Sequence, residues 1–192
     1  MPENKPDSWE LPASDPSEYH AVEATRGREF ILRLTTKADP NLAIARFARE
    51  KGIRYGKVHA TFMGAFKPCK YLMWVPDPSA PENWHREDIA VVDNLSMLCA
   101  IGGMIGIRKK KDGTEESFVA MHFVAGGGWN VPTFGGHLAD GTIVCGVMQV
   151  FITELLGIEY LSPSLDPYGE ADTFPENWYS KTSEKPREQN NL

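Results

Sequence analysis

The sequence has few of the features that mark a secreted, membrane-spanning or disulfide-stabilised protein. Its cysteines, Cys69, Cys99 and Cys145, lie far apart and form no CxxC motif. This pattern argues against both a disulfide framework and a thiolate zinc site. No run approaches the roughly 20 apolar residues that span a bilayer, and the polar start MPENKPDSWE lacks the pattern of a signal peptide. We therefore expect a cytoplasmic protein with reduced cysteines and no membrane partner.

Positive charge is also scarce. The 192 residues contain 20 Lys and Arg against 26 Asp and Glu, which gives a net charge of −6. Affinity for nucleic acid depends on neutralising phosphates with basic side chains. The composition therefore disfavours generic DNA binding and allows only a local DNA contact. The hydrophobic share of 42% is ordinary for a folded domain, and the length favours a single one.

The two ends of the chain read as tails. Residues 1–24 are rich in Pro, Ser, Asp and Glu, and residues 162–192 contain four prolines. Such segments bury too little apolar area to offset the entropy of ordering. We expect a folded body over residues 25–161. A few aromatic residues are expected to dock part of the second tail onto the body or a neighbouring subunit: Phe174, Trp178 and Tyr179.

The body is predicted to be mainly strands. EFILRLTT at 29–36 alternates apolar and polar residues, which is the period of a half-buried strand. Asp112-Gly113 is a hairpin signal. Six or seven strands are expected in all, over residues 29–36, 54–66, 70–75, 96–110, 117–125 and 142–155. Residues 76–88 and the glycine-rich 126–141 are expected to be connections.

One helix is expected, in ADPNLAIARFAREKG. Asp39 can cap it, Pro40 suits its first position, and Gly52 can end it. Five apolar positions form one predicted stripe that lies on a sheet: Leu42, Ile44, Ala45, Phe47 and Ala48.

Two of the predicted strands are apolar on both faces. In 118–124, Phe118, Ala120, His122 and Val124 oppose Val119, Met121 and Phe123, and the 142–152 strand behaves likewise. A sheet that is apolar on both faces must be covered on both, and one helix covers only one. The second cover is either another layer of the same curling sheet or another copy of the chain.

The histidines are the candidates for a metal or proton-transfer site. His20 and His85 lie in polar segments and are expected to be solvated. The other three, His59, His122 and His137, could hold zinc or another divalent ion. The alternative is that each is a hydrogen-bonded histidine near a subunit contact. Two acids could serve a histidine site as base: Asp140 and Glu154.

Other motifs point to no chemistry. GGGWNVPTFGGH lacks the Lys-Ser/Thr ending of a P-loop. The basic run at 108–111 precedes a hairpin turn and two glutamates, as expected of a solvated turn. No Ser/His/Asp or Cys/His arrangement is detectable.

The segments GREFILRLTTKADPNLAIARFAREKGI and GGHLADGTIVCGVMQVFITEL, with the His122 strand between them, resemble the PPC domain family, conserved in plants and prokaryotes. The similarity runs over about residues 25–161. It implies an α+β fold, mainly antiparallel sheet with one packed helix, assembled as a homotrimer. Members are commonly labelled DNA-binding proteins because plant versions carry an AT-hook. This chain has Arg26-Gly27-Arg28 without the following proline or basic flanks, so no AT-hook is predicted.

Many prokaryotic members have a His-x-His strand and the GGHL histidine, which together form a metal unit. On this chain these positions are Ala120, His122 and His137, so one ligand is missing and His59 is the candidate substitute. The plant members recruit partners through an acidic residue in an apolar strand. At the matching position this chain has Met97 in place of the acid.

The sequence thus favours a non-catalytic, homotrimeric binding or regulatory protein that reaches DNA through protein partners. The alternative is a metal-dependent enzyme or small-molecule binder that uses a zinc site at His59, His122 and His137. A cupin-like barrel is a third possibility, suggested by Pro132, Gly135 and His137, but it lacks the early His-x-His-plus-Glu element.

Overall fold

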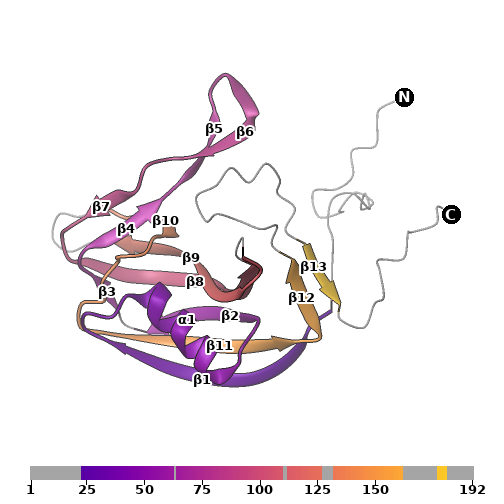
Figure 1. Cartoon of the computed structure of the whole chain (residues 1–192). Coiled ribbons are helices and arrows are strands. Elements are labelled where there is room, and N and C mark those ends of the chain that lie inside the picture. Colours follow the sequence, from indigo (N-terminus) through magenta and orange to yellow (C-terminus); the bar gives the residue numbers. More distant parts are fainter. Residues whose placement is uncertain (1–22, 63, 110–111, 127–131, 162–176, 181–192) are drawn as a thin grey trace, which may run out of the picture.

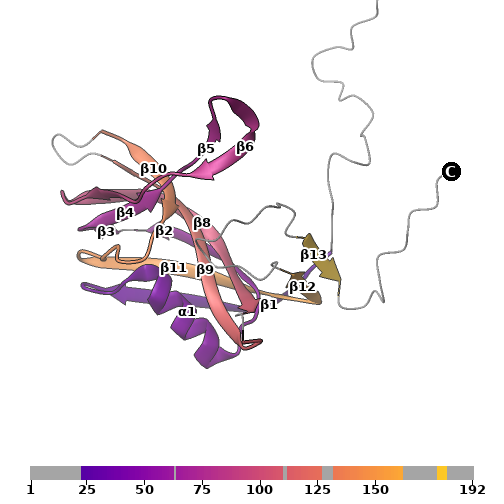
Figure 2. The same ribbon diagram turned by 45° about the horizontal axis from the view of Figure 1, so that its top comes forward.

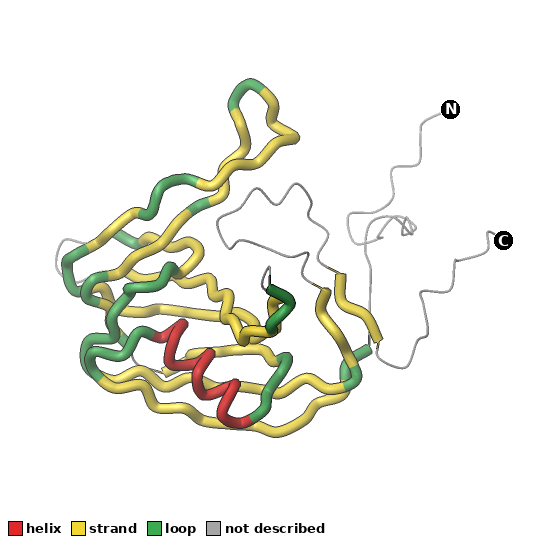
Figure 3. Tube along the Cα trace, viewed as in Figure 1, coloured by secondary structure: helices red, strands yellow, loops and turns green. Residues whose placement is uncertain are grey.

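A computed structural model describes residues 23–62, 64–109, 112–126, 132–161 and 177–180. The described part contains one helix and thirteen strands (Figures 1 and 3). The helix is α1 (Pro40–Lys51). The strands are β1 (Thr25–Thr35), β2 (Gly56–Phe62), β3 (Ala65–Phe66), β4 (Cys69–Leu72), β5 (Trp74–Asp77), β6 (Ala80–Arg86), β7 (Ala90–Val92), β8 (Ser96–Lys109), β9 (Glu115–Gly126), β10 (Phe134–Leu138), β11 (Val147–Leu156), β12 (Ile158–Leu161) and β13 (Asn177–Ser180). The predicted mainly antiparallel α+β fold with one helix is confirmed.

One large antiparallel sheet organises the molecule. Its strand order is β1-β11-β2-β8-β9-β10-β4-β7, with β3 paired to β8. Most strands that are neighbours in this order are distant in sequence. The sheet is therefore complete only when strands from both ends of the body have paired. Two small ribbons lie outside it, β5–β6 and β12–β13.

The helix begins and ends at the predicted residues. The Asp39 side chain accepts a hydrogen bond from the backbone N–H of Leu42, and Pro40 occupies the first turn. Gly52 takes the left-handed conformation, with φ of 66°, and its backbone N–H closes the last turn. The predicted stripe is wrong at one position, because Leu42 is 52% exposed while Asn41 is buried in its place.

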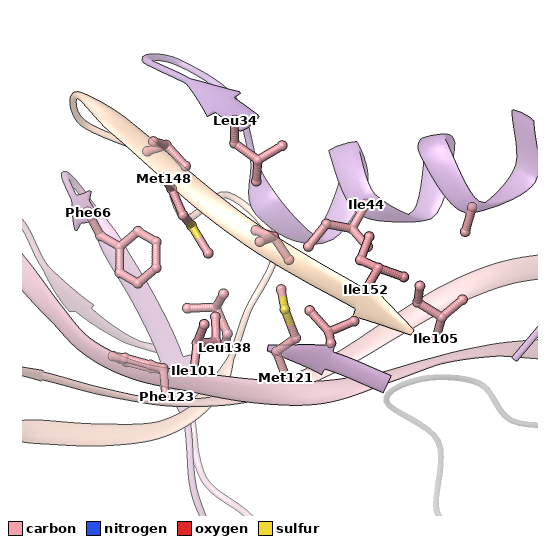
Figure 4. Packing of buried hydrophobic residues seen from close by; sticks show 14 of the residues in the cluster. Leu34, Ile44, Phe66, Ile101, Ile105, Met121, Phe123, Leu138, Met148 and Ile152 are labelled. Atoms are coloured by element: carbon pink, nitrogen blue, oxygen red, sulfur yellow. The ribbon is translucent and has the colours of Figure 1, made fainter. Parts of the chain in front are cut away.

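The sheet curls around the helix and encloses the main core, and a smaller cluster forms around Tyr55 and Ile158. Phe47 of α1 packs edge-on against Phe30 of β1, and the same helix packs against β9. These two strands lie four positions apart, or about 19 Å in a flat sheet, whereas a helix is about 10 Å wide. Only a curled sheet can bring both to one helix. Figure 4 shows the shared core, which includes Leu34, Ile44, Phe66, Ile101, Ile105, Met121, Phe123, Leu138, Met148 and Ile152.

The two faces of the sheet therefore differ in how far the rest of the chain shields them from solvent. On β11, Met148, Val150 and Ile152 are fully buried against the core. On β9, Met121 is also fully buried and Phe123 is 3% exposed. The opposite face of the same strands points away from the core and keeps several apolar side chains. Curling of the same sheet accounts for the cover of the concave face, and we call the convex one the outward face.

Two predicted connections contain strands. The segment expected to be a loop at 76–88 forms most of the β5–β6 ribbon, which projects from the body in Figure 2. The glycine-rich connection contains β10, which pairs with both β9 and β4. In both cases prolines or glycines hid strands whose pairing is decided by neighbours elsewhere in the chain.

The C-terminal segment returns to the body in part. Trp178 and Tyr179 lie on β13 and pair in register with Tyr160 and Glu159 of β12. Phe174 and His20 lie outside the described residues. No helix in the described part of the chain has the length and apolar character needed to cross a membrane.

Candidate metal centre on the outward face

Three of the predicted site histidines lie in one row across the sheet. His59 of β2 pairs with Gly102 of β8, Gly102 pairs with His122 of β9, and His122 pairs with His137 of β10. Directly paired residues of antiparallel strands project from the same face of a sheet. The row therefore places all three imidazoles on the outward face.

Strand alternation explains why His59 and His122 face outward. Their neighbours Val58, Met121 and Phe123 are buried in the core, so the residues between them must project the other way. Both histidines are exposed.

Two glycines bring His137 beside His122. A Cβ at Gly135 would lie 2.3 Å from the carbonyl oxygen of Phe123, and one at Gly136 would lie 2.9 Å from that of Leu72. Only glycine lets β10 fit this closely between β9 and β4. The GGHL motif is therefore a close-packed strand that positions its histidine.

The two neighbouring imidazoles converge. Nδ1 of His137 lies 3.3 Å from Nε2 of His122, and the rings stand nearly perpendicular at 88°. Two nitrogen ligands on a tetrahedral zinc, each about 2.0–2.1 Å from the metal, are separated by about 3.3–3.4 Å. The pair thus fits two corners of a tetrahedral metal site, and it also fits a hydrogen bond between neutral imidazoles.

Electrostatics favours the neutral form of His137. Burial lowers its pKa, and the neighbouring His122 lowers it further, while Asp140 opposes the shift. Neutral imidazole is the form that binds a metal. His137 is therefore suited to ligation at neutral pH.

His59 stays apart from this pair. It lies two strands from His122, with Gly102 between them, and the outward face is convex there. Ala120, on the same face of β9 as His122, supplies no ligand. Within the described residues, no group of three His, Cys, Asp or Glu side chains is close enough to hold a metal ion.

The remaining candidate residues have other contacts. Asp140 accepts a hydrogen bond from the side-chain amide of Asn41. Glu154 forms an ion pair with Arg28 at 2.7 Å, and Arg26 pairs with Glu29. His85 lies on β6, and its side chain is exposed. The two arginines of the Arg-Gly-Arg sequence are thus held by carboxylates on a strand.

Of the apolar residues beside the histidines, Val124 was placed on the His122 face from the sequence, whereas Ile31 was not singled out. Ile31 of β1 is 69% exposed and lies in the same row, through Phe151 of β11, while Val124 of β9 is 43% exposed. The signal for Ile31 was present, since it is an apolar residue at an outward position of an otherwise alternating strand.

Comparisons with known proteins agree with this fold. The family model of the Plants and Prokaryotes Conserved (PCC, also PPC) domain matches residues 21–156. No functionally curated protein matches the sequence.

Several solved structures are similar. A plant- and prokaryote-conserved (PPC) protein of Pyrococcus horikoshii has 21% identity and a TM-score of 0.59, covering 76% of this chain and 92% of that one. A metal-containing protein of Archaeoglobus fulgidus has 20% identity and a TM-score of 0.57, covering 84% and 100%. A "putative DNA-binding protein" of Ralstonia eutropha has 14% identity and a TM-score of 0.51, covering 78% and 89%. At these identities the similarity concerns the fold.

Proposed function

The chain belongs to the Plants and Prokaryotes Conserved domain family, and from this premise we propose that it is a non-catalytic binding and regulatory protein. It assembles as a homotrimer through the outward face of its sheet and works in the cytoplasm. It reaches DNA through protein partners.

The observation that carries this proposal is the apolar outward face. Ile31 and Val124 are 69% and 43% exposed on the same face of one sheet. Phe151, which is half-buried, lies between Ile31 and His59 in the same row. A convex sheet face with several apolar side chains is typical of an interface between proteins. Closed rings of identical chains are a common way to cover such a face.

Charge substitution on the outward face tests the assembly. We expect light scattering after size exclusion to give about three times the chain mass of 21.4 kDa for the native protein. Ile31→Lys and Val124→Lys should lower that mass. Leu42→Lys is the matched control, since Leu42 is also exposed but lies on the helix. An unchanged mass in both outward-face variants would contradict the proposed contact.

Charge argues against direct DNA contact. The net charge is −6, and the Arg26 and Arg28 side chains are engaged by Glu29 and Glu154. Titration of an AT-rich duplex at low salt should therefore show no binding tighter than the micromolar range of non-specific association. Tighter binding that falls steeply with salt would argue for direct DNA contact.

A second function is supported by the His122–His137 pair. The converging nitrogens at 3.3 Å favour a zinc or other divalent metal site, with His59 as the predicted further ligand. Such an ion would supply Lewis acidity to a small ligand. Metal analysis of the purified protein checks this: bound zinc that disappears in His122→Ala and His137→Ala favours a metal-dependent binder or enzyme.

A further inference from the structure

A second apolar cluster lies at one end of the outward face, apart from the main core. Its centre consists of Tyr55, just before β2, and Ile158 of β12, each 3% exposed. Four partly buried side chains pack against them: Met104, Ile107, Phe118 and Leu155. Met104 pairs with Ala120 of β9, which lies on the same face of its strand as His122. The cluster therefore shares the outward face with the histidine row.

A glycine shapes the floor of this cluster. A Cβ on Gly106 of β8 would lie 2.6 Å from a ring carbon of Phe118, so the missing side chain lets the ring lie against the strand. The same Cβ would lie 3.5 Å from the terminal methyl of Met104. We call Tyr55, Met104 and Phe118 the strap patch. It is an apolar surface built by the body of the domain.

The cover of the strap patch comes from outside the family domain. The family model matches residues 21–156 and thus ends with Leu156, the last residue of β11. Gly157 follows in the left-handed conformation, with φ of 77°, and an added Cβ there would meet only Thr25 Oγ1, at 4.0 Å. β12 begins at the next residue, Ile158, whose side chain packs into the cluster. An addition to the family domain therefore covers the patch.

The ribbon that carries Ile158 is separate from the large sheet. Within the described residues, β12 and β13 form a two-stranded sheet of their own, and β12 lies beside β8 (Figure 1). A ribbon of two strands is only marginally stable by itself in water. The burial of Ile158 against the strap patch is therefore the contact that favours the closed position of the ribbon.

We propose that the β12–β13 ribbon is an intramolecular strap, which occupies the strap patch and keeps a second copy of the chain out of it. An uncovered apolar surface of this kind is an association site, and the open patch of one copy can pack on that of another about a twofold axis. The closed strap confines contacts between copies to the part of the outward face around Ile31 and Val124. It does not depend on the ring assembly, because it is a contact within one chain.

Opening the strap in the full-length chain tests the proposal. Ile158→Lys places a charge in the buried cluster and should release the ribbon. Peroxide oxidation of methionines, followed by mass spectrometry, should then proceed about threefold faster or more at Met104 than in the native protein. Met121 is fully buried in the main core and should stay protected in both proteins. Light scattering should show a concentration-dependent mass that approaches about twice the native value.

Two further variants provide controls. Leu156→Lys adds the same charge two residues earlier, at a side chain that is 45% exposed, and should leave both the Met104 oxidation rate and the mass at native values. The double variant Met104→Lys/Ile158→Lys places a charge on the open patch itself. Its mass should return to the native value, which separates association through the patch from aggregation of a misfolded chain.

Each other result overturns the strap. Unchanged oxidation of Met104 in Ile158→Lys means that Ile158 does not cover the patch. Faster oxidation of Met121 in the same variant means that the ribbon belongs to the cooperative core. Faster oxidation of Met104 without a higher mass means that no second copy takes the open patch, and a high mass that persists in the double variant means that association uses another surface. The mass of the native protein tests the ring assembly separately, because the strap predicts only the increase over it.

Discussion

At the scale of single residues, one ion pair connects both ends of the body. Arg28 of β1 donates from Nε and Nη2 to the two carboxylate oxygens of Glu154 on β11, each at 2.7 Å, and its backbone N–H donates to the same group. Arg28 also donates to the backbone carbonyl of Lys51 at the end of α1. Glu154 is buried, so its charged form depends on these donors.

This pair predicts a pH dependence of stability. The hydrogen bonds from Arg28 hold the pKa of Glu154 below its ordinary value. Its contribution is therefore present above the pKa of an unfolded glutamate, about 4.3, and is lost as the pH falls through the lower folded value. Urea midpoints measured from about pH 7 to pH 3 should show native protein more stable than Glu154→Gln at neutral pH, with the difference shrinking on acidification.

The opposite sign applies to Asp39, whose pKa is raised by burial. Its contribution to stability is present at low pH and is lost as the pH rises. Because the native protein and Glu154→Gln both keep Asp39, this contribution cancels in the difference between them. A native-minus-variant difference that grows as the pH falls would contradict the assignment to Glu154.

Burial also predicts a difference in thiol reactivity. Desolvation raises the pKa of Cys69 to about 12, and its side chain is fully buried, whereas Cys99 is exposed. Because the thiolate is the reactive form, Cys69 should react with a chromogenic thiol reagent only after unfolding. Cys69→Ala should leave the number of rapidly reacting thiols of the native protein unchanged, and a decrease by one would refute the assignment.

At the scale of elements, helix α1 was predictable because its signals are local. Asp39, Pro40 and Gly52 act on the backbone within a few residues, and all three act as expected. The buried face was less predictable. Asn41 is buried because its amide donates to the Leu138 carbonyl and to Asp140, which lie at the end of β10 and in the turn after it, far away in sequence.

The helix gives a graded stability prediction. Asp39→Ala removes the cap and the hydrogen bond to the Gly141 N–H, and should lower the free energy of unfolding by about 1–2 kcal/mol. Ile44→Ala opens a cavity in the core and should cost about 2–5 kcal/mol. Leu42→Ala changes an exposed position and should stay within about 0.5 kcal/mol. Chemical denaturation checks the order, which a larger loss at Leu42 than at Ile44 would contradict.

Strand pairing was the least predictable feature. The alternation in β1 and β9 identified which side chains share a face, and Met148, Val150 and Ile152 are buried together as their spacing indicates. The row that joins His59, His122 and His137 depends instead on register between strands far apart in sequence. A pattern within one strand does not fix that register.

At the scale of the whole molecule, the curled sheet decides what the site can be. Its concave side closes over α1 and forms the core, while its convex side spreads the histidine row and leaves apolar residues exposed. The sequence indicated that both faces are apolar. It did not indicate that one chain covers the concave face fully and the outward face only in part, where Met104 and Phe118 pack with Tyr55 and Ile158, because the curl results from α1 packing against β1 and β9 together.

The central claim is that the outward face is covered by another copy of the chain. Hydroxyl-radical footprinting of the native protein, with side-chain oxidation rates read by mass spectrometry, tests it most directly. Ile31 and Val124 should be protected despite exposed fractions of 69% and 43% in the single chain, while Leu42, at 52%, should be oxidised readily. Oxidation of Ile31 and Val124 as fast as that of Leu42 would contradict the account.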